Sequence, residues 1–224
     1  MYLDLLIQLG GREIAIHDSI FNVVVVTILL IIFAIIVNKK IKEASIDDEP
    51  STFLIIVELL VEGIQGLVKS TMGEHNLGFT PYIFTLLIFL AASNLFGLTG
   101  LTPPTSDYSV TISLALITFV LSQYWNYKNS GGLKGYLKGY TEPLVILTPL
   151  NVIGDLANPV SLSFRLFGNI MGGGIIMALI YNALGYFAPV VAAPLHIYFD
   201  IFSGLLQAFI FTMLTMIFIG GAEE

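Results

Sequence analysis

The sequence predicts an all-α polytopic membrane protein, and two observations lead to this fold class. Of the 224 residues, 56% are hydrophobic and 11% are charged, whereas roughly a quarter of the residues in a soluble domain are charged. The apolar residues gather in runs of about 20, the length that crosses a ~30 Å hydrocarbon core as a helix. The absence of cysteine excludes disulfides, thiolate metal sites and thiol catalysis. The net charge of -7 comes largely from loops and chain ends, so no nucleic-acid partner is expected.

The apolar runs divide the chain into the parts of a single membrane domain. The first run has no basic residue before it, unlike the start of a cleaved signal peptide, so the span that follows is expected to be a retained anchor. The predicted parts are an outer N-terminal segment 1–19, a first span 20–37, an interfacial helix 52–70, a hairpin 79–98 and 108–125, and two tilted helices 144–187 and 190–219.

Segment 52–70 carries polar residues at spacings of four, three and four, which place them in one stripe on a helix. Such a stripe suits a helix that lies in the membrane interface or edges an aqueous cavity. A span surrounded by lipid would instead bury carboxylates at a high cost. The stripe consists of Glu58, Glu62, Gln65 and Lys69.

The lysines favour a flat orientation for segment 52–70. If it lies on the inner face, every lysine is cytoplasmic and Arg12 alone is outside, in agreement with the enrichment of Lys and Arg in cytoplasmic loops. If it spans, the lysines from Lys69 onward join Arg12 outside. We therefore predict five passes, an outer N-terminus and a cytoplasmic C-terminus. The lysines are Lys39, Lys40, Lys42, Lys69, Lys128, Lys134 and Lys138.

The 44 residues of segment 144–187 would form a helix about 66 Å long, roughly twice the bilayer core. Asn158 and Pro159 disfavour helical geometry, so we predict a break or kink there and a long tilted helix from about Ser161. Within that helix, Gly168 and Gly172 form a smooth face that another backbone can approach closely. Gly173 and Gly174 adjoin them.

Arg165 is the main candidate functional residue because it lies deep in an apolar stretch. A guanidinium there is costly and stays protonated. Snorkelling to the interface, or permanent pairing with an acid, is the structural alternative. No acid lies within one helical turn, so the charge is available to a carboxylate of another subunit. Asp155 lies ten residues earlier, across the expected break, and pairing with it stays open.

Further polar residues follow on the same helix and on the last one. Asn169, four residues after Arg165, is predicted either to orient the guanidinium or hold a water, or to bond another helix. Asp200, Ser203 and Gln207 form one polar stripe, in which Asp200 is either an ion relay or a carboxylate that meets water at the helix end. Asp107 is favoured as a helix cap.

Four segments of the chain resemble the signature segments of the a subunit of F-type ATP synthases, over about residues 20–219. The resemblance implies an ion-translocating stator with two aqueous half-channels. The implied partners are a rotating c-subunit ring, a b-subunit peripheral stalk, the remainder of the synthase and the bilayer. The segments are Asn-Pro-Val-Ser-Leu at 158–162, Arg-Leu-Phe-Gly-Asn at 165–169, Leu-Gln-Ala-Phe-Ile-Phe at 206–211 and Pro-Thr-Ser-Asp at 104–107.

By this resemblance, Arg165 is similar to the arginine that displaces the ion from the ring carboxylate and blocks leakage between the half-channels. Asn169 and Gln207 match polar positions of the two tilted helices. Many bacterial members carry an acid where this chain has Gly174, and a histidine where it has Asp200. We therefore expect Asp200 to replace the missing acid from the neighbouring helix.

The sequence thus predicts an H⁺- or Na⁺-translocating subunit in a bacterial plasma membrane. It lacks a GxxxxGK[ST] loop that would bind nucleotide, and neither a cofactor nor a metal is expected. Asp107, Asn169, Asp200, Ser203 and Gln207 are assigned to the ion pathway, and Gly168 and Gly172 to the surface that faces the ring. The alternative is an autonomous channel or secondary transporter that uses Arg165 as a counter-charge. A purely structural anchor would leave Arg165, Asp200 and Gln207 without a reason.

Overall fold

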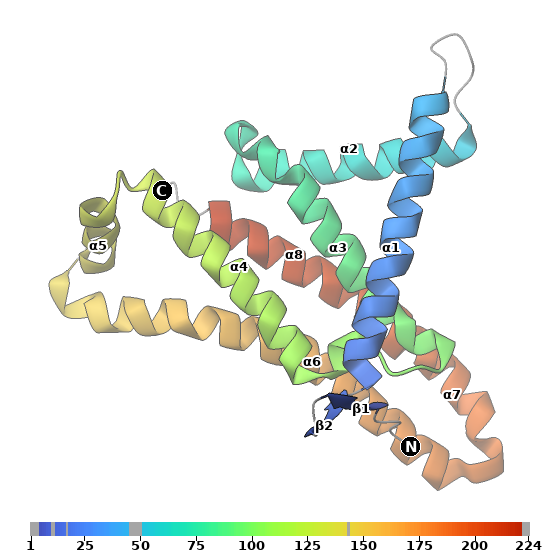
Figure 1. Ribbon diagram of the computed structural model, residues 1–224. Coiled ribbons are helices and arrows are strands. Elements are labelled where there is room, and N and C mark those ends of the chain that lie inside the picture. The colour runs from blue at the N-terminus through green and yellow to red at the C-terminus, as the bar shows by residue number, and fades with distance from the viewer. Residues whose placement is uncertain (1–4, 10–11, 17, 45–50, 143, 221–224) are drawn as a thin grey trace.

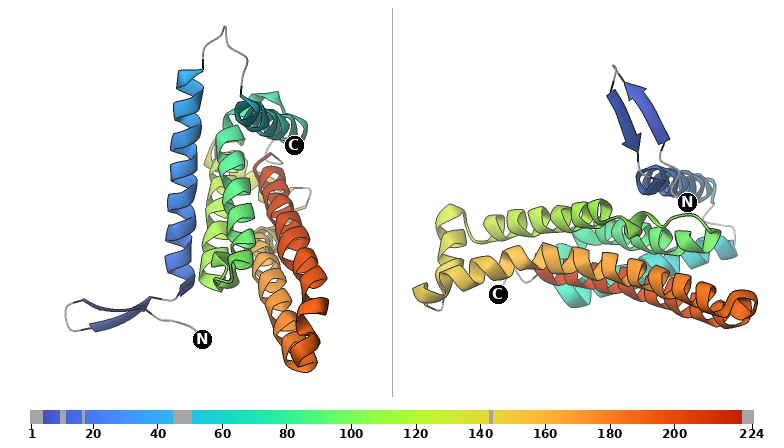
Figure 2. Two further views of the ribbon diagram at one scale, coloured as in Figure 1. Left: turned by 90° about the vertical axis from the view of Figure 1, so that its right-hand side faces the viewer. Right: turned by 90° about the horizontal axis from the view of Figure 1, so that it is seen from below.

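Helices make up most of the described chain (Figure 1). The strands β1 (Leu5–Leu9) and β2 (Arg12–Ile16) pair antiparallel, and their hairpin projects away from the helices (Figure 2). The sequence analysis does not predict this hairpin, which lies within the expected outer segment. The structure, a computed structural model, describes residues 5–9, 12–16, 18–44, 51–142 and 144–220.

The helix α1 (Asp18–Glu43) stands at the side of the bundle (Figure 2). Its buried residues lie in its first turns, where Asn22 Nδ2 donates to the carbonyl of Thr102 at 2.8 Å. Much of its remaining surface is exposed and apolar. The helix is therefore attached to the bundle mainly near its start.

The helix α2 (Thr52–Met72) runs across the direction of α1 (Figure 1). Ser51 caps its start, because the Oγ atom accepts the backbone N–H of Leu54 at 3.4 Å. One face of α2 packs onto the bundle, and the polar stripe lies outside this face. The buried residues are Ile64, Val68 and Met72.

The next two helices pack against different partners. The helix α3 (Thr80–Leu95), between the 3₁₀ turns Glu74–Phe79 and Phe96–Thr99, lies along α8, whereas α4 (Tyr108–Asn129) lies along α6. The short 3₁₀ turn Pro104–Ser106 leads into α4. After α4 the chain turns through Gly131 and Gly132, whose φ angles are 70° and 104°. Residues with a Cβ rarely adopt such positive φ angles. The helix α5 (Leu133–Thr141) follows.

The helix α6 (Thr148–Leu184) follows the 3₁₀ turn Val145–Leu147 and contains Pro159 in its interior. The helix continues through this proline, so the predicted division into a short entering segment and a helix from about Ser161 is wrong. Proline lacks the backbone N–H that would donate within the helix, but its fixed φ of about -65° is compatible with helical geometry. Pro159 itself is buried, and the helix around it lies along α4.

The last part of the chain returns alongside α6 (Figure 1). A 3₁₀ turn, Gly185–Phe187, joins α6 to α7 (Ala188–His196). A π-helical segment, Ile197–Ser203, then leads into α8 (Gly204–Gly220). We call the end of the molecule with α7 and the start of α1 the α7 end, and the opposite end, with α5 and the end of α8, the α5 end.

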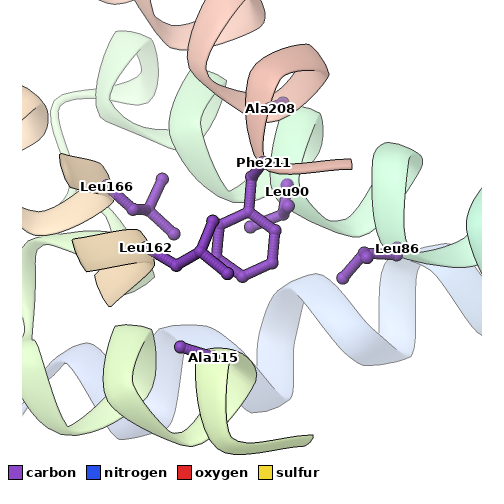
Figure 3. Packing of buried hydrophobic residues seen from close by; sticks show 7 residues of the cluster. All are labelled: Leu86, Leu90, Ala115, Leu162, Leu166, Ala208 and Phe211. Carbon is purple, nitrogen blue, oxygen red and sulfur yellow. The ribbon is translucent and has the colours of Figure 1, made fainter. Parts of the chain in front are cut away.

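The main core lies where α3, α4, α6 and α8 meet, and Phe211 is fully buried within it (Figure 3). A second cluster joins α2 to α3 and α8. The main cluster comprises Leu86, Leu90, Ala115, Leu162, Leu166, Ala208 and Phe211, and the second Ile64, Val68, Met72, Ile83, Met216 and Ile219.

Large apolar side chains also cover the outside of the bundle; Val190 is 78% exposed and Val120 is 63% exposed. An apolar surface of this extent is typical of contact with lipid. Within the described residues, the stretches long and apolar enough to cross a membrane include the one that holds α6, α7 and α8 but not α2. The chain is an integral membrane protein. These stretches are Asp18–Glu43, Glu74–Thr99, Tyr108–Asn129 and Val145–Gly220.

Candidate functional site

Arg165 lies near the middle of α6, and its side chain is exposed on the outside of the bundle. Among the described residues it has neither a hydrogen bond nor a salt bridge with another side chain. The neighbouring Phe164 is 55% exposed, so the charge is set in an apolar surface. An arginine in such a place costs about 3 kcal/mol on insertion scales.

Two glycines share the face of Arg165, because they follow it by three and seven residues. A Cβ added at Gly168 or Gly172 would meet nothing within 4 Å. Gly173 differs, since its Cβ would lie 3.4 Å from the Phe199 ring of the π-helical segment. The predicted smooth face is therefore unoccupied at Gly168 and Gly172, while Gly173 packs within the chain.

Asn169 connects α6 to the π-helical segment. Its Oδ1 accepts the Ser203 hydroxyl at 2.8 Å, and its Nδ2 donates to the Ser203 carbonyl at 3.3 Å. Of the two roles predicted for Asn169, the structure thus shows the hydrogen bond to another helix. Among the described residues, Asn169 makes no hydrogen bond to Arg165. Side-chain spacing alone could not decide this, because Ser203 comes from another helix.

Asp200 and His196 form the closest polar pair of the site. His196 Nδ1 lies 2.5 Å from Asp200 Oδ2, and His196 Nε2 lies 3.0 Å from the Tyr181 hydroxyl. These contacts link the end of α6 to the π-helical segment. The sequence analysis missed His196 and Tyr181, although the spacing of four residues between His196 and Asp200 is a signal of side-chain contact.

A cavity of about 520 Å³ opens beside this pair, towards the α7 end. Asp200, His196, Gly174 and Asn169 all line it. Asp200 and Gly174 therefore face one cavity, although they come from different helices. A Cβ added at Gly174 would meet nothing within 4 Å, so the position has room for a side chain.

The remaining predicted residues lie apart from this cavity lining. Gln207 is buried in α8, and its Nε2 has no hydrogen-bond partner among the described residues. Asp107 caps α4, because its Oδ1 accepts the backbone N–H of Ser109 at 2.8 Å. Asp155 bonds Gln123 and Tyr140, not Arg165.

Asn94 is a further buried polar residue that the sequence analysis missed. Its Nδ2 donates to the Gly204 carbonyl at 2.8 Å, and its Oδ1 accepts the Thr105 hydroxyl at 2.8 Å. An amide within the apolar α3 was the available signal. Asn94 also lines the cavity and ties α3 to the junction of the π-helical segment and α8.

The described residues contain no group of three or more His, Cys, Asp or Glu side chains that could hold a metal ion. The polar groups near Asp200 are instead arranged in a line of hydrogen bonds, which can pass a proton between neighbours.

Comparison with known proteins identifies the family. The family model "ATP synthase A chain" matches residues 20–220. ATP synthase subunit a of Mycoplasma pneumoniae is 34% identical over 231 residues, covering 92% of this chain and 79% of that protein. The subunit a of Trichlorobacter lovleyi is 37% identical over 218 residues, covering 93% and 90%.

A relative with a stated ion is also similar to this chain. The protein of Propionigenium modestum described as "ATP synthase subunit a, sodium ion specific" is 36% identical over 179 residues, covering 71% of this chain and 59% of that protein. The family model, which matches most of the chain, and the relatives named above indicate the same family. The chain belongs to the ATP synthase A chain family, the membrane subunits of a multi-subunit ATP synthase that serves ATP synthesis and ion transport.

Proposed function

We propose that this chain is the stator-side ion-translocating subunit of a rotary ATP synthase, and that Arg165 faces the rotating c-subunit ring. The observation that carries the proposal is the exposed guanidinium of Arg165 in an apolar surface, without a partner among the described residues. An unpaired charge at this depth is costly. A ring carboxylate that passes Arg165 would compensate for this cost and release its ion.

The open glycine positions support a ring contact on the same face. Gly168 and Gly172 have no neighbouring atom within 4 Å of an added Cβ, and small residues allow helices in membranes to approach closely. A ring helix could therefore pass near the α6 backbone next to Arg165. The b-subunit peripheral stalk is proposed as a second partner through the family alone.

The orientation is proposed from the lysines. The end of α1, the end of α2, the end of α4 and the whole of α5 lie at the α5 end (Figure 1), and these segments hold the seven lysines of the chain. The positive-inside rule places this end in the cytoplasm. The proposal includes five passes in a bacterial plasma membrane, with α2 in the inner interface and the N-terminus outside.

With this orientation, the cavity beside Asp200 is the outer half-channel. Ions reach Asp200 from outside through the cavity of about 520 Å³, and His196 passes or holds a proton beside it. Ser203 and Asn169 continue the polar lining from the π-helical segment to α6. Asp200 thus supplies the carboxylate that Gly174 does not.

Replacement of Arg165 tests the proposal. Arg165→Ala should abolish ATP synthesis driven by an imposed ion gradient in proteoliposomes while the complex still assembles, because the side chain makes no contact that holds this chain together. Arg165→Lys should not restore coupling, since a buried lysine can lose its proton and lacks the planar guanidinium. Lys138→Ala, which removes an exposed cation of α5, is the matched control.

Normal synthesis by the Arg165→Ala complex would contradict the proposal. The channel or transporter alternative predicts a stable solitary oligomer, whereas the stator predicts co-purification with a ring of small two-helix subunits. Purification of the tagged chain under mild conditions distinguishes these outcomes.

A further inference from the structure

Asn94 of α3 is a buried amide, 2% exposed, and both ends of its side chain are bonded. Its Oδ1 accepts the Thr105 hydroxyl, and its Nδ2 donates to the Gly204 carbonyl, each at 2.8 Å. A buried polar group that loses its partner is destabilising. The two bonds therefore fix the position of the Gly204 backbone relative to α3.

Gly204 is the residue at which the π-helical segment ends and α8 begins. The residue before it, Ser203, is held from another side by the two hydrogen bonds with Asn169 of α6. Two consecutive residues are thus held by side-chain amides of two different helices. On α8 the main core cluster begins at Ala208, so these bonds fix the turn that precedes the core.

The close approach of α3 to this junction depends on a glycine. A Cβ added at Gly204 would lie 3.3 Å from the Asn94 Cβ, which is shorter than the optimum of about 3.5–4.0 Å between carbon atoms. A larger residue at position 204 would push the Asn94 amide away from the carbonyl that it bonds. The start of α8 is therefore positioned on α3 through Asn94.

The π-helical segment is also held against α6, at Phe199. A Cβ added at Gly173 would lie 3.4 Å from the Phe199 ring and 3.5 Å from the Phe199 Cβ. Five residue steps separate this contact from the bond at Gly204. A π turn closes over five residues and an α turn over four, so the two contacts match the length of a π turn.

The π turn determines which side chain faces the cavity at the α7 end. In an α turn counted back from Gly204, Asp200 would take the place that Phe199 now occupies and would face Gly173. Ile201 would then take the place of Asp200 in the cavity lining. An apolar side chain would replace the carboxylate there, although the sequence would be unchanged.

The same shift separates Asp200 from Gln207. Seven residues make nearly two α turns, so a regular helix would place both side chains on one face, as the sequence predicts. In the structure, Asp200 lines the cavity whereas Gln207 is buried in α8. The π turn between them accounts for this difference.

We propose that Asn94 is a positioning residue, which holds the Gly204 carbonyl, maintains the π turn and thereby directs Asp200 into the cavity at the α7 end. The effect of Asn94 on ion transport rests on the proposed function. Its effect on the register of the π-helical segment does not, and the two effects can be measured separately.

Disulfide cross-linking reports the register, because the chain has no cysteine of its own. Gly173→Cys combined with Phe199→Cys places two Cβ atoms 3.5 Å apart, within the range of about 3.5–4.5 Å found in disulfides. Gly173→Cys combined with Asp200→Cys reports the α register instead. In whole ATP synthase in membranes, we expect the first pair to oxidise quickly and the second slowly.

Replacement of Asn94 should reverse this preference. Asn94→Leu removes both hydrogen bonds, and Asn94→Asp keeps the shape but loses the donor to Gly204. We expect each change to slow the first disulfide about tenfold, the effect of one lost buried hydrogen bond, and to accelerate the second. Ser93→Ala is the matched control and should change neither rate, since Ser93 is a buried neighbour whose Oγ has no hydrogen-bond partner among the described residues.

Thr105→Val extends the test to a variant that keeps the donor, should an Asn94 variant fail to assemble. It removes only the hydroxyl that Asn94 Oδ1 accepts, so the amide can rotate away from Gly204. Both cross-linking rates should change in the same directions as for Asn94→Leu, by a smaller factor. Unchanged rates in every variant that assembles would overturn the proposal.

Ion transport gives the second readout. In proteoliposomes, synthesis per assembled complex should fall about tenfold in Asn94→Asp, less than in Asp200→Asn, because the carboxylate is turned away and not removed. A fall in synthesis with unchanged cross-linking would mean that Asn94 acts only as cavity lining, and would overturn the positioning role. Normal synthesis with altered cross-linking would overturn its effect on transport. Cross-linking requires no ion flux, so it decides the register even if Arg165→Ala is active and the proposed function fails.

Discussion

Asp200 is the carboxylate on which the outer half of the proposed pathway depends. Its Oδ2 lies 2.5 Å from His196 Nδ1, and it lines the cavity at the α7 end. Asp200→Asn keeps the size of the side chain but removes the titrating group. We expect gradient-driven ATP synthesis to fall about 100-fold, the lower range for a positioned proton-transfer group, while the amount of assembled complex stays unchanged.

A second substitution tests whether the position of the acid or only its presence matters. Gly174 lines the same cavity and has room for a side chain, so Gly174→Glu in the Asp200→Asn background should recover part of the flux. ATP synthesis in the single and double variants is the measurement. An unaffected single variant, or a double variant no better than the single, would mean that Asp200 is a solvated helix-end residue.

At the residue scale, the sequence was better at identifying polar residues than at pairing them. The four-residue spacing put Asn169 beside Arg165, yet helix packing brings Asn169 to Ser203. Asp155 shows the same limit, since its partners Gln123 and Tyr140 come from other helices. Partners within one helix follow from spacing, but partners across helices depend on packing that one sequence does not reveal.

Among the elements, the π-helical segment Ile197–Ser203 is the feature that periodicity could not predict. A π turn holds one residue more than an α turn and so shifts the residues after it around the helix by one position. In a run that is apolar throughout, this shift leaves no mark on the hydrophobic pattern of the sequence. The shift sets the register between Asp200 and Ser203 on one side and Gln207 on the other. Such π turns occur frequently at functional sites.

The α6 glycines distinguish a surface for another subunit from a contact within the chain. Gly172 has no neighbour within 4 Å of an added Cβ, so Gly172→Leu should leave the chain folded but hold the ring away from Arg165. We expect the assembled complex to lose most of its coupled synthesis, because a bulky residue forces closely packed helices apart. Synthesis per assembled complex in proteoliposomes is the measurement.

Gly173→Leu is the comparison, since Gly173 packs against Phe199 at 3.4 Å. Its added side chain would separate α6 from the π-helical segment, so the amount of assembled complex should fall before activity is measured. Full coupled activity of Gly172→Leu would contradict a ring contact at this face. Equal assembly defects in the two variants would show instead that both glycines pack within the chain.

At the scale of the molecule, apolar run lengths were sufficient to predict helices and a membrane, because both depend on burial of apolar surface in lipid. The hairpin of β1 and β2 and the continuity of α6 through Pro159 depend on local backbone pairing and packing, which run lengths do not describe. The transverse course of α2 (Figure 1) agrees with its polar stripe. The orientation of the whole bundle, however, stays a prediction from the lysines.

The prediction for the whole molecule is that Leu101, in the loop at the α7 end, and Lys134 of α5 lie on opposite sides of the membrane. In a chain without native cysteine, Leu101→Cys should react with an impermeant maleimide on intact cells, and Lys134→Cys only in inside-out vesicles. Both residues are exposed, so accessibility within the chain does not limit the reaction. The unmodified chain is the control for background labelling.

The same experiment decides whether α2 lies flat or spans, because one additional pass would exchange the sides of every later loop. If α2 spans, Lys134→Cys reacts on intact cells and Leu101→Cys only in inside-out vesicles. A flat α2 also predicts a difference between its faces. Glu62→Cys, in the polar stripe, should react from the cytoplasmic side, whereas Leu60→Cys, whose native side chain is 55% exposed, should be protected by lipid. Reaction of both α2 positions from the cytoplasmic side would place α2 in water, outside the interface where its carboxylates and its apolar face are both accommodated.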